Sequence, residues 1–307
     1  MEEEHVLIVG TGAMACLFAA RLAPHVQVTM LGTWEAGLEA LQDQGVRLIE
    51  LDGSEVNYPV EVGSEPEQFP PIHSALILVK SWQTTRAAEQ LKSCLAPQGI
   101  ALTLQNGIGN LEKIQDVVGP ERVALGVTTM GATLLGPGKV RLGGIGPTYI
   151  VHNDRLASME GVLNRAGFEM RTVEDLDRLI WGKLAINAGI NPLTALLHVP
   201  NGELLKRPDA RHLMVAAARE TVSVATAKGI ASSSEDPESR IVQVAWRTAQ
   251  NHSSMFQDVL RGAPTEIDVI CGAIVREGKQ LHIPTPVNET LWHLVRALVN
   301  KQGEMEG

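Results

Sequence analysis

Short apolar runs separated by helical segments make up the first half of the chain. Residues 5–9 read HVLIV, residues 75–80 read ALILVK and residues 100–105 read IALTLQ. Strands that are apolar at nearly every position are typical of a parallel sheet with both faces covered, because neither face meets water. This half therefore predicts a doubly wound α/β fold.

The same pattern places the other elements of this half. We expect further strands at residues 26–31, 47–51, 56–62, 123–130 and 168–173, and helices at 81–95, 110–117 and 154–166. Residues 47–51 and 56–62 predict an antiparallel pair around a turn at Asp52 and Gly53. The glycine-rich segment 131–152 predicts hairpins that close the sheet with antiparallel strands.

From Leu176 onward the periodicity is helical. The predicted helices lie near residues 175–190, 208–228, 236–249, 255–260, 265–281 and 287–300. Pro208, Asp236 with Pro237, and Thr285 with Pro286 stand where helices are expected to begin. The sequence thus predicts an α/β domain over residues 1–173 and an all-helical domain over residues 174–307.

Composition and charge narrow the class of protein. The 307 residues are 44% hydrophobic, and the net charge is −9. An acidic chain with a pI near 5.5 is a poor partner for nucleic acid or an anionic membrane, so we expect a small-molecule ligand. The three cysteines have no metal-type spacing, which favours free, buried thiols in a reducing cytoplasm. The acidic start lacks the features of a signal peptide, and the sequence leaves the oligomeric state open, a homodimer included.

The stretch GTGAMA at residues 10–15 directly follows the first predicted strand and opens the first predicted helix. This context is the one that a dinucleotide-binding turn requires. Gly10 permits the tight turn, and Gly12 lets the backbone approach a pyrophosphate. The helix start at Ala13 and Met14 supplies amide donors, so we expect Gly10, Thr11, Gly12, Ala13 and Met14 to bind a cofactor.

The second predicted strand gives no decisive sign of which dinucleotide binds. An acid at its end would bind a ribose hydroxyl, whereas an arginine would accept a 2′-phosphate. The segment there reads LGTWEA, so Thr33 is the expected neighbour and Glu35 the nearest acid. Lys80 ends another predicted strand, where an ammonium group could attract a phosphate or a carboxylate.

Lys183, Asn187 and Asn191 interrupt the apolar stretch WGKLAINAGINPLTALL, residues 181–197, at intervals of four. Positions four apart stay near one helix face, so the three form a polar stripe. A lysine among apolar neighbours is partly desolvated, which lowers its pKa and eases proton donation near neutral pH. The alternative is a lysine whose head group reaches water.

Local rules offer structural explanations for the other polar candidates. Asn191 before Pro192 could cap a helix and break the stripe there. Ser254 with Gln257 fits a capping box, Glu266 fits a first-turn acid, and Asn106 begins an Asn-Gly turn. These readings leave open whether each residue also binds a ligand.

Six blocks of the sequence together resemble the ketopantoate reductase (2-dehydropantoate 2-reductase) family over nearly the whole chain. They are GTGAMA, VKSWQT (79–84), LQNGIG (104–109), KLAINAGINPLTAL (183–196), PNGEL (200–204) and SSMFQDV with the following TEIDVICG (265–272). The resemblance implies an N-terminal Rossmann domain, a helical C-terminal domain, and NADPH-dependent reduction of a ketone in pantothenate biosynthesis. NADH remains the alternative, because LGTW lacks the arginine that family members commonly carry near the end of the second strand.

The resemblance also implies roles for individual residues. Lys183 would protonate the ketone oxygen, with Glu266 as its acidic partner. The substrate would be held by Asn106, Asn187, Asn191 and Ser254, and the cofactor side would include Lys80 and Asn106. Two other hypotheses stay open: a reductase of another 2-keto acid, and a non-catalytic dinucleotide-binding sensor.

Overall fold

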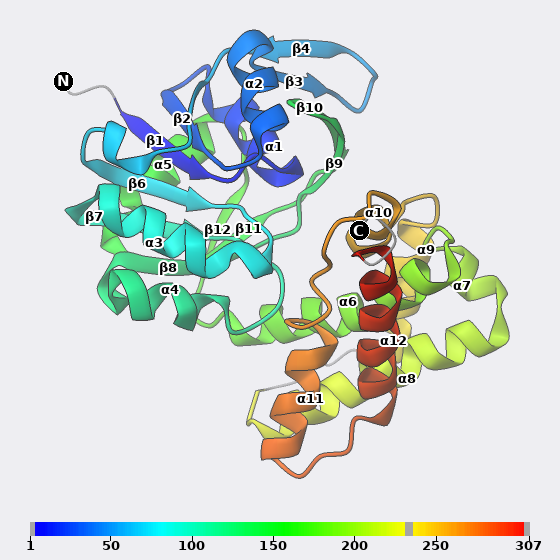
Figure 1. The fold of residues 1–307 in the computed structure, drawn as a ribbon. Helices are drawn as coiled ribbons and strands as arrows, with labels where there is room; N and C mark the ends of the chain where they lie inside the picture. Colours follow the sequence, from blue (N-terminus) through cyan, green and yellow to red (C-terminus); the bar gives the residue numbers. More distant parts are fainter. Residues whose placement is uncertain (1–3, 231–235, 304–307) are drawn as a thin grey trace. The chain divides into compact units, whose positions relative to one another are not determined.

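The computed structural model describes residues 4–230 and 236–303, with side chains as far as Val299. Contacts within the chain divide it into two compact units. The sheet unit consists of Met1–Gln105 and Asn110–Leu176, and the helical unit consists of Asn106–Gly109 and Asp177–Gly307. Figure 1 shows the strands in the blue to green part of the chain and the helical unit in green to red.

The main sheet of the sheet unit has the strand order β12-β11-β8-β7-β6-β1-β2-β5. Neighbouring strands from β8 to β5 pair in parallel, whereas β11 is antiparallel to β8. The strands are β1 (His5–Val9), β2 (Gln27–Leu31), β5 (Glu61–Gly63), β6 (Ile72–Ile77), β7 (Leu95–Thr103), β8 (Val123–Thr128), β11 (Thr148–Val151) and β12 (Met170–Val173).

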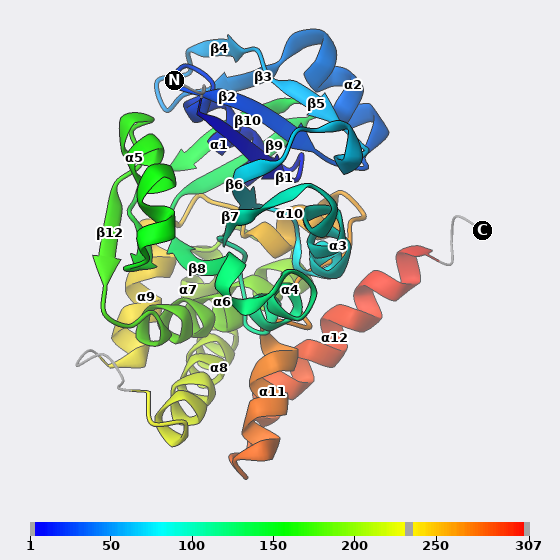
Figure 2. The same cartoon turned by 90° about the vertical axis from the view of Figure 1, so that its left-hand side faces the viewer.

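Helices cover both faces of this sheet. Successive residues of a strand point to opposite faces, and on β1 Ile8 joins one hydrophobic core while Leu7 joins the other. The first core contains residues of α1 and α5, and the second contains residues of α3 and α4, which Figure 2 shows side by side. The prediction of a doubly wound α/β fold is confirmed. The helices are α1 (Ala13–Leu22), α2 (Glu35–Gln44), α3 (Thr84–Cys94), α4 (Asn110–Val118) and α5 (Ala157–Arg165), with short 3-10 segments η1 (Pro66–Gln68), η2 (Ser81–Gln83), η3 (Pro120–Arg122) and η4 (Asp154–Leu156).

A second, smaller sheet corrects two predictions. Its order is β4-β3-β10-β9, made of β3 (Val46–Ile49), β4 (Glu55–Tyr58), β9 (Gly131–Gly136) and β10 (Lys139–Gly144). The hairpin β9–β10 therefore does not close the main sheet, whereas β11, at the end of the same segment, does join it antiparallel to β8 as predicted. Val140 and Leu142 on β10 are buried in the core that contains α1. The strand predicted at 56–62 splits at Pro59 into β4 and β5, because proline has no N–H to continue a ladder.

In the helical unit, α6 (Asp177–Leu197) packs against α8, α9, α10 and α12. The other helices are α7 (Glu203–Lys206), α8 (Pro208–Ala227), α9 (Pro237–Arg247), α10 (Ser254–Leu260), α11 (Cys271–Gln280) and α12 (Pro286–Gly303). The predicted starts at Pro208, Pro237 and Pro286 are confirmed. Gly189 of α6 allows α8 to approach closely, because a Cβ there would lie 2.5 Å from the carbonyl oxygen of Met214.

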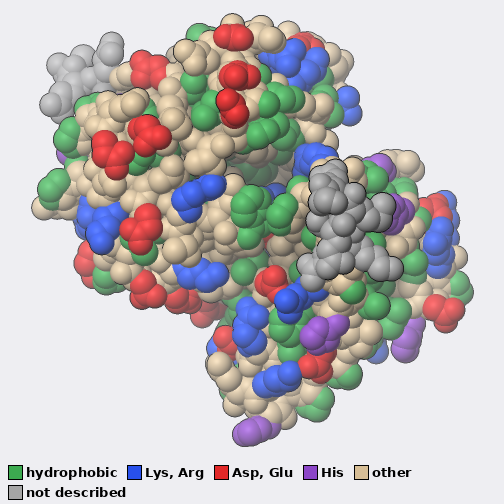
Figure 3. Space-filling model, viewed as in Figure 1, with side chains coloured by type: hydrophobic (Ala, Val, Ile, Leu, Met, Phe, Trp, Pro, Cys, Tyr) green, Lys and Arg blue, Asp and Glu red, His purple; other side chains and the backbone are tan. Residues whose placement is uncertain are grey.

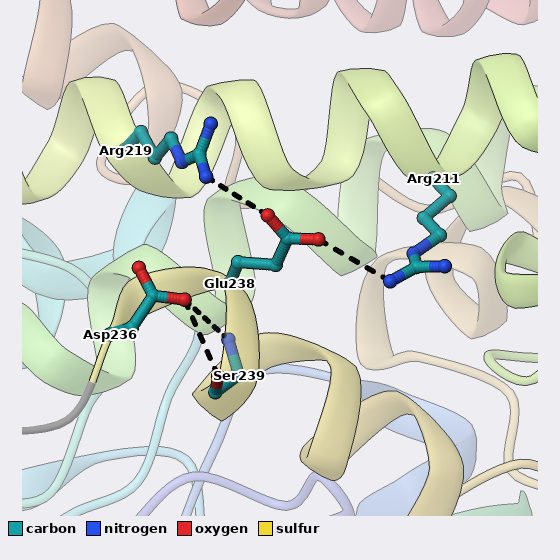
Figure 4. Close-up of polar contacts among 5 residues, drawn as sticks. All are labelled: Arg211, Arg219, Asp236, Glu238 and Ser239. Atoms are coloured by element: carbon teal, nitrogen blue, oxygen red, sulfur yellow. Dashed lines mark hydrogen bonds and ion pairs between the residues drawn. The ribbon is translucent and has the colours of Figure 1, made fainter.

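Ion pairs connect α9 with α8. Glu238 at the start of α9 pairs with Arg211 at 3.3 Å and with Arg219 at 2.9 Å, and both arginines come from α8 (Figure 4). Asp236 caps α9 by accepting a hydrogen bond from the Ser239 amide at 3.1 Å. In the view of Figure 3, acidic and basic side chains are interspersed.

Two further findings concern the cysteines and the hydropathy of the helices. Cys16, Cys94 and Cys271 are buried free thiols, as predicted. Within residues 4–230 and 236–303, no helix is both long and apolar enough to cross a membrane.

Candidate active site

The glycine-rich turn joins β1 to α1, and backbone contacts of Gly10 fix its conformation. Gly10 has φ +130°, a conformation that L residues rarely adopt, and its amide donates to the carbonyl oxygen of Leu31 at 2.8 Å. A Cβ on Gly10 would lie 3.1 Å from the carbonyl oxygen of Leu78. The turn is therefore tied to the ends of both neighbouring strands, β2 and β6.

Gly12 occupies a different position in the same turn. It is the N-cap of α1 with φ −82°, which any residue adopts, and a Cβ there would meet nothing within 4 Å. The first-turn amides of a helix have no intrahelical acceptor and carry a partial positive charge. Open space beside such amides fits a pyrophosphate group. Ala15 stands in place of the third glycine of the motif. It is fully buried where α1 packs against the sheet, a position that requires a small residue.

Thr33 and Lys80 follow segments that contact this turn. Gly32, just before Thr33, packs on Thr11, since a Cβ on Gly32 would lie 2.7 Å from the Thr11 Cγ2. Lys80 follows Val79, whose Cγ1 would lie 3.3 Å from a Cβ on Gly10. The carboxyl ends of β1, β2 and β6 thus gather the cofactor residues predicted in this unit.

Gln105 holds the VKSWQT segment in place, a role that we did not predict. Its Nε2 donates to the Val79 carbonyl oxygen at 3.1 Å and to the Thr84 Oγ1 at 2.9 Å. The Thr84 hydroxyl lies 3.1 Å from the Asn110 Oδ1. The sequence signal was present, because Gln105 and Thr84 each lie inside one of the blocks that carry the resemblance.

The polar stripe lies on one continuous helix, which corrects the capping interpretation of Asn191. The helix α6 runs through Pro192 to Leu197, so Asn191 lies inside it and is 6% exposed. Proline removes the amide that would donate to the Ala188 carbonyl oxygen. The Cys271 thiol lies 3.9 Å from that oxygen, and burial raises the pKa of this thiol, so that it keeps its proton as a donor.

Lys183 has an altered proton affinity. Burial lowers the pKa of its ammonium group to about 8, and the carboxylate of Glu266 opposes this by favouring the charged form. The residue as a whole retains some exposure. A lysine in this state is charged at neutral pH but releases its proton more readily than an ordinary lysine.

Glu266 lies in a turn ahead of α11 rather than in the first turn of a helix. The helix expected at residues 265–281 is shorter in the structure, where α11 begins only at Cys271. Glu266 is 4% exposed, and the Asn106 Nδ2 donates to its Oε2 at 3.3 Å. Asn106 and Glu266 are 160 residues apart in sequence, so this contact is a product of the fold.

The NGIG loop that carries Asn106 belongs to the helical unit by its contacts. The Ile108 amide donates to the Val269 carbonyl oxygen at 3.2 Å. Gly107 has φ +81°, and a Cβ there would lie 2.5 Å from the same oxygen. Asn106 therefore both begins the Asn-Gly turn and contacts Glu266, so its structural role does not exclude a role in the site.

The capping box predicted at Ser254 is displaced by one residue. Ser253 is the N-cap of α10, and its Oγ accepts from the Phe256 amide at 3.1 Å. Gln257 donates through Nε2 to the His252 carbonyl oxygen at 3.0 Å. Ser254 is the first residue of α10, next to the cap.

The helical unit thus brings Lys183, Glu266 and Asn106 together through a hydrogen bond and a charge interaction. Asn187 and Asn191 continue along α6, and Ser254 begins α10, which packs on α6. A charged donor with a lowered pKa, a carboxylate and several amides can bind an anionic carbonyl compound and protonate its oxygen.

Known proteins are similar to this chain in sequence and in fold. Residues 6–155 match the family described as Ketopantoate reductase PanE/ApbA, and residues 175–299 match its C-terminal part. A 2-dehydropantoate 2-reductase of Halobacterium salinarum is 36% identical over 298 residues, covering 95% of this chain and 97% of the relative.

Two solved structures have the same fold along almost their full length. The crystal structure of a PanE/ApbA family ketopantoate reductase from Ralstonia eutropha has a TM-score of 0.90 at 30% identity, covering 97% of this chain and 99% of the other. D-mandelate dehydrogenase, solved with NADH and anilino(oxo)acetate, has a TM-score of 0.91 at 25% identity with the same coverage. With both of its parts matched and relatives aligned end to end, this chain belongs to the ketopantoate reductase family of NAD(P)H-dependent reductases.

Proposed function

We propose that this protein reduces 2-dehydropantoate (ketopantoate) to pantoate with NADPH, a step of pantothenate biosynthesis. The observation that carries the proposal is the lowered pKa of Lys183, to about 8, beside a Glu266 that Asn106 contacts. Several curated relatives named 2-dehydropantoate 2-reductase support the choice of substrate.

Lys183 is the proposed proton donor. A nicotinamide held by the glycine-rich turn would supply a hydride to the carbonyl carbon, so the carbonyl oxygen needs a proton. The Lys183 Nζ gives that proton to the oxygen, and its positive charge offsets the negative charge that develops there. Glu266 keeps the ammonium form populated, because it raises a pKa that burial alone would lower further.

Asn106, Asn187, Asn191 and Ser254 are the proposed substrate ligands. Amide and hydroxyl groups can donate hydrogen bonds to the carboxylate and exchange them with the hydroxyl group of the substrate. Their positions along α6, at the start of α10 and in the NGIG loop place them on the same unit as Lys183.

The proposed cofactor site consists of Gly10, Thr11, Gly12, Ala13, Met14, Thr33, Lys80 and Asn106. We assign cofactor binding to the domain 1–173 and catalysis to the helical domain 174–307. The preference for NADPH depends on Thr33 and Lys80, since the end of β2 carries no arginine and Glu35 stands close by in sequence. A ratio of kcat/KM for NADPH over NADH above one would support this preference, and a ratio below one would reverse it.

The function is tested by mixing the purified protein with ketopantoate and following the loss of reduced cofactor. Turnover with NADPH is expected, and product analysis should show pantoate. A panel of other 2-keto acids serves as the comparison, and a higher kcat/KM with one of them would replace the substrate. Absence of turnover with ketopantoate in the presence of either NADPH or NADH would overturn the proposal.

A further inference from the structure

Thr194 lies three residues beyond Asn191 on α6 and has its hydroxyl group in the protein interior. The residue is 0% exposed. Its Oγ1 lies 3.0 Å from the Ile190 carbonyl oxygen, 3.0 Å from the Asn191 carbonyl oxygen and 2.7 Å from the Ser253 Oγ. Thr194 therefore connects the backbone of α6 to the residue that caps α10.

In the contact between Thr194 and Ser253, either hydroxyl could be the donor. The Thr194 hydroxyl has one proton, and the carbonyl oxygens of Ile190 and Asn191 can only accept it. When Thr194 donates to these carbonyls, it accepts from the Ser253 hydroxyl, whose oxygen in turn accepts from the Phe256 amide at 3.1 Å. The chain of donors runs from the first turn of α10 through Ser253 and Thr194 to the backbone of α6.

The two ends of this chain lie beside two proposed substrate ligands. One end is the carbonyl of Asn191, and the other is the cap that directly precedes Ser254. The helix α10 has only seven residues, and so short a helix depends on tertiary contacts for its position.

We propose that Thr194 is a positioning residue, which together with Ser253 fixes the start of α10 on α6 and so sets the place of Ser254 relative to Asn191. This inference rests on the proposed function, because it assumes that Ser254 and Asn191 hold the same substrate. Thr194 acts through Ser253 and does not itself touch the substrate.

A simpler account is that Thr194 only bonds to its own helix, as buried threonines often do. Thr221 on α8 provides a matched control for that account. It is also 0% exposed, and its Oγ1 donates to the Ala217 carbonyl oxygen four residues earlier at 2.8 Å. Thr221→Val and Thr194→Val thus each remove a buried hydroxyl of the same local type, but Thr194→Val alone also affects Ser253.

The test compares Thr194→Val, Thr194→Ser and Thr221→Val in the full-length protein. Thr194→Val should raise the KM for ketopantoate roughly tenfold, as expected for loss of one buried hydrogen bond and a displaced ligand. The KM for NADPH and the midpoint of the pH profile should stay unchanged. Thr194→Ser, which keeps the hydroxyl, and Thr221→Val should both have the wild-type KM for ketopantoate.

Hydrogen exchange of the Phe256 amide gives a readout that needs no turnover. It should accelerate in Thr194→Val and stay slow in Thr221→Val, because the first variant alone disturbs the Ser253 cap. Equal exchange in the two variants, or accelerated exchange with an unchanged KM for ketopantoate, would overturn the inference. Failure of the proposed function is distinct, since wild-type protein would then show no turnover while the exchange comparison still reports on the cap.

Discussion

The two units build their parts of the proposed site by different means. In the sheet unit, backbone geometry shapes the site: Gly10 closes a turn against the ends of β2 and β6, and Gly12 leaves space beside the start of α1. In the helical unit, side chains shape it: Lys183 and Asn191 project from α6, and Glu266 is held in a buried turn by Asn106. The site in the sheet unit depends on the absence of side chains, whereas the site in the helical unit depends on the charge and hydrogen bonds of its side chains.

This difference predicts how each part fails. A substitution in the glycine turn acts through steric contact and should change folding or cofactor affinity. A substitution in the helical unit acts through charge and proton affinity and should change the rate or its pH dependence. Substitutions in each unit can therefore test this difference.

Lys183→Ala should have the largest effect. Loss of a general acid lowers the rate by roughly 10²- to 10⁴-fold, and the effect should fall on kcat, because the amino group acts as the proton is transferred. Asn187→Ala should show a larger share of its loss in KM for the keto acid. Steady-state kinetics and the dissociation constant of NADPH, which should not change, provide the measurements.

Lys206→Ala is the control for Lys183→Ala. Lys206 is an exposed lysine of α7 that pairs with Glu203 in its own helix, and its removal should leave kcat unchanged. Small and equal losses in Lys183→Ala and Asn187→Ala would argue against separate roles for the two residues.

Gly10→Ala and Gly12→Ala separate the steric role of a glycine from its binding role. A Cβ on Gly10 combines a strained φ with a close approach to Leu78, so the free energy of unfolding should fall by about 1–3 kcal/mol. Gly12→Ala should change that free energy by less than about 0.5 kcal/mol, because a Cβ there meets nothing within 4 Å.

Cofactor titration completes the comparison of the two glycines. Gly12→Ala should weaken NADPH binding while the protein stays folded, because the added methyl group enters the space proposed for the pyrophosphate. Unfolding by urea and cofactor binding by fluorescence give the two measurements. Wild-type affinity for NADPH in Gly12→Ala would place the pyrophosphate elsewhere.

Most elements of the sheet unit could be predicted from sequence because they follow local rules, although the helix α2 (Glu35–Gln44) was not predicted. An apolar run followed by GTGAMA gives strand, turn and helix without knowledge of the remaining chain. The same rules failed where partner strands had to be chosen: β9 and β10 form a hairpin as predicted, but β10 pairs with β3 and the hairpin packs on α1 instead of joining the main sheet. Hairpin signals are local, whereas the sheet that a hairpin joins depends on distant contacts.

The rate should depend on pH through the protonation of Lys183. Lys183 donates a proton, so the active form is the ammonium, and kcat/KM should be high below the lowered pKa and decline as the pH rises through about 8. An ordinary lysine would retain its proton to a much higher pH. A profile of kcat/KM between pH 6 and 10 measures this limb.

Glu266→Gln tests the cause of that limb. The carboxylate raises the pKa of Lys183, so its neutralisation should move the falling limb to lower pH. Glutamine keeps an oxygen that can accept from Asn106, which separates the loss of charge from the loss of the contact. An unchanged midpoint in Glu266→Gln would show that another group titrates.

The helical unit shows why side-chain sites are harder to predict than backbone turns. The stripe of Lys183, Asn187 and Asn191 followed from helical spacing, but local rules placed a helix start at Pro192, where the helix continues. A tertiary contact accompanies this exception, since the Cys271 thiol lies near the carbonyl oxygen that Pro192 leaves without its usual donor. Likewise, no spacing rule predicts that Asn106 contacts Glu266 or that Thr194 contacts Ser253, since both contacts join distant segments.

The smallest effect is expected at Trp292, which supports the turn that carries Glu266. The Trp292 Nε1 donates to the Asp268 Oδ1 at 2.7 Å, and the Arg276 Nη2 donates to the Asp268 carbonyl oxygen at 2.8 Å. Trp292→Phe removes one of these bonds, which should cost about 0.5–1.5 kcal/mol of unfolding free energy and lower kcat only a few-fold.

Asp268→Asn is the matched variant for Trp292→Phe, because asparagine keeps an oxygen at Oδ1 that can accept from the indole N–H. If the hydrogen bond supports the turn, Asp268→Asn should retain nearly all of the rate that Trp292→Phe loses. If the negative charge of Asp268 matters instead, through its approach of 4.0 Å to Arg296, the order of the two variants should reverse. The two variants therefore measure the most indirect effect in the helical unit, in which a side chain affects Lys183 only by holding the backbone that carries Glu266.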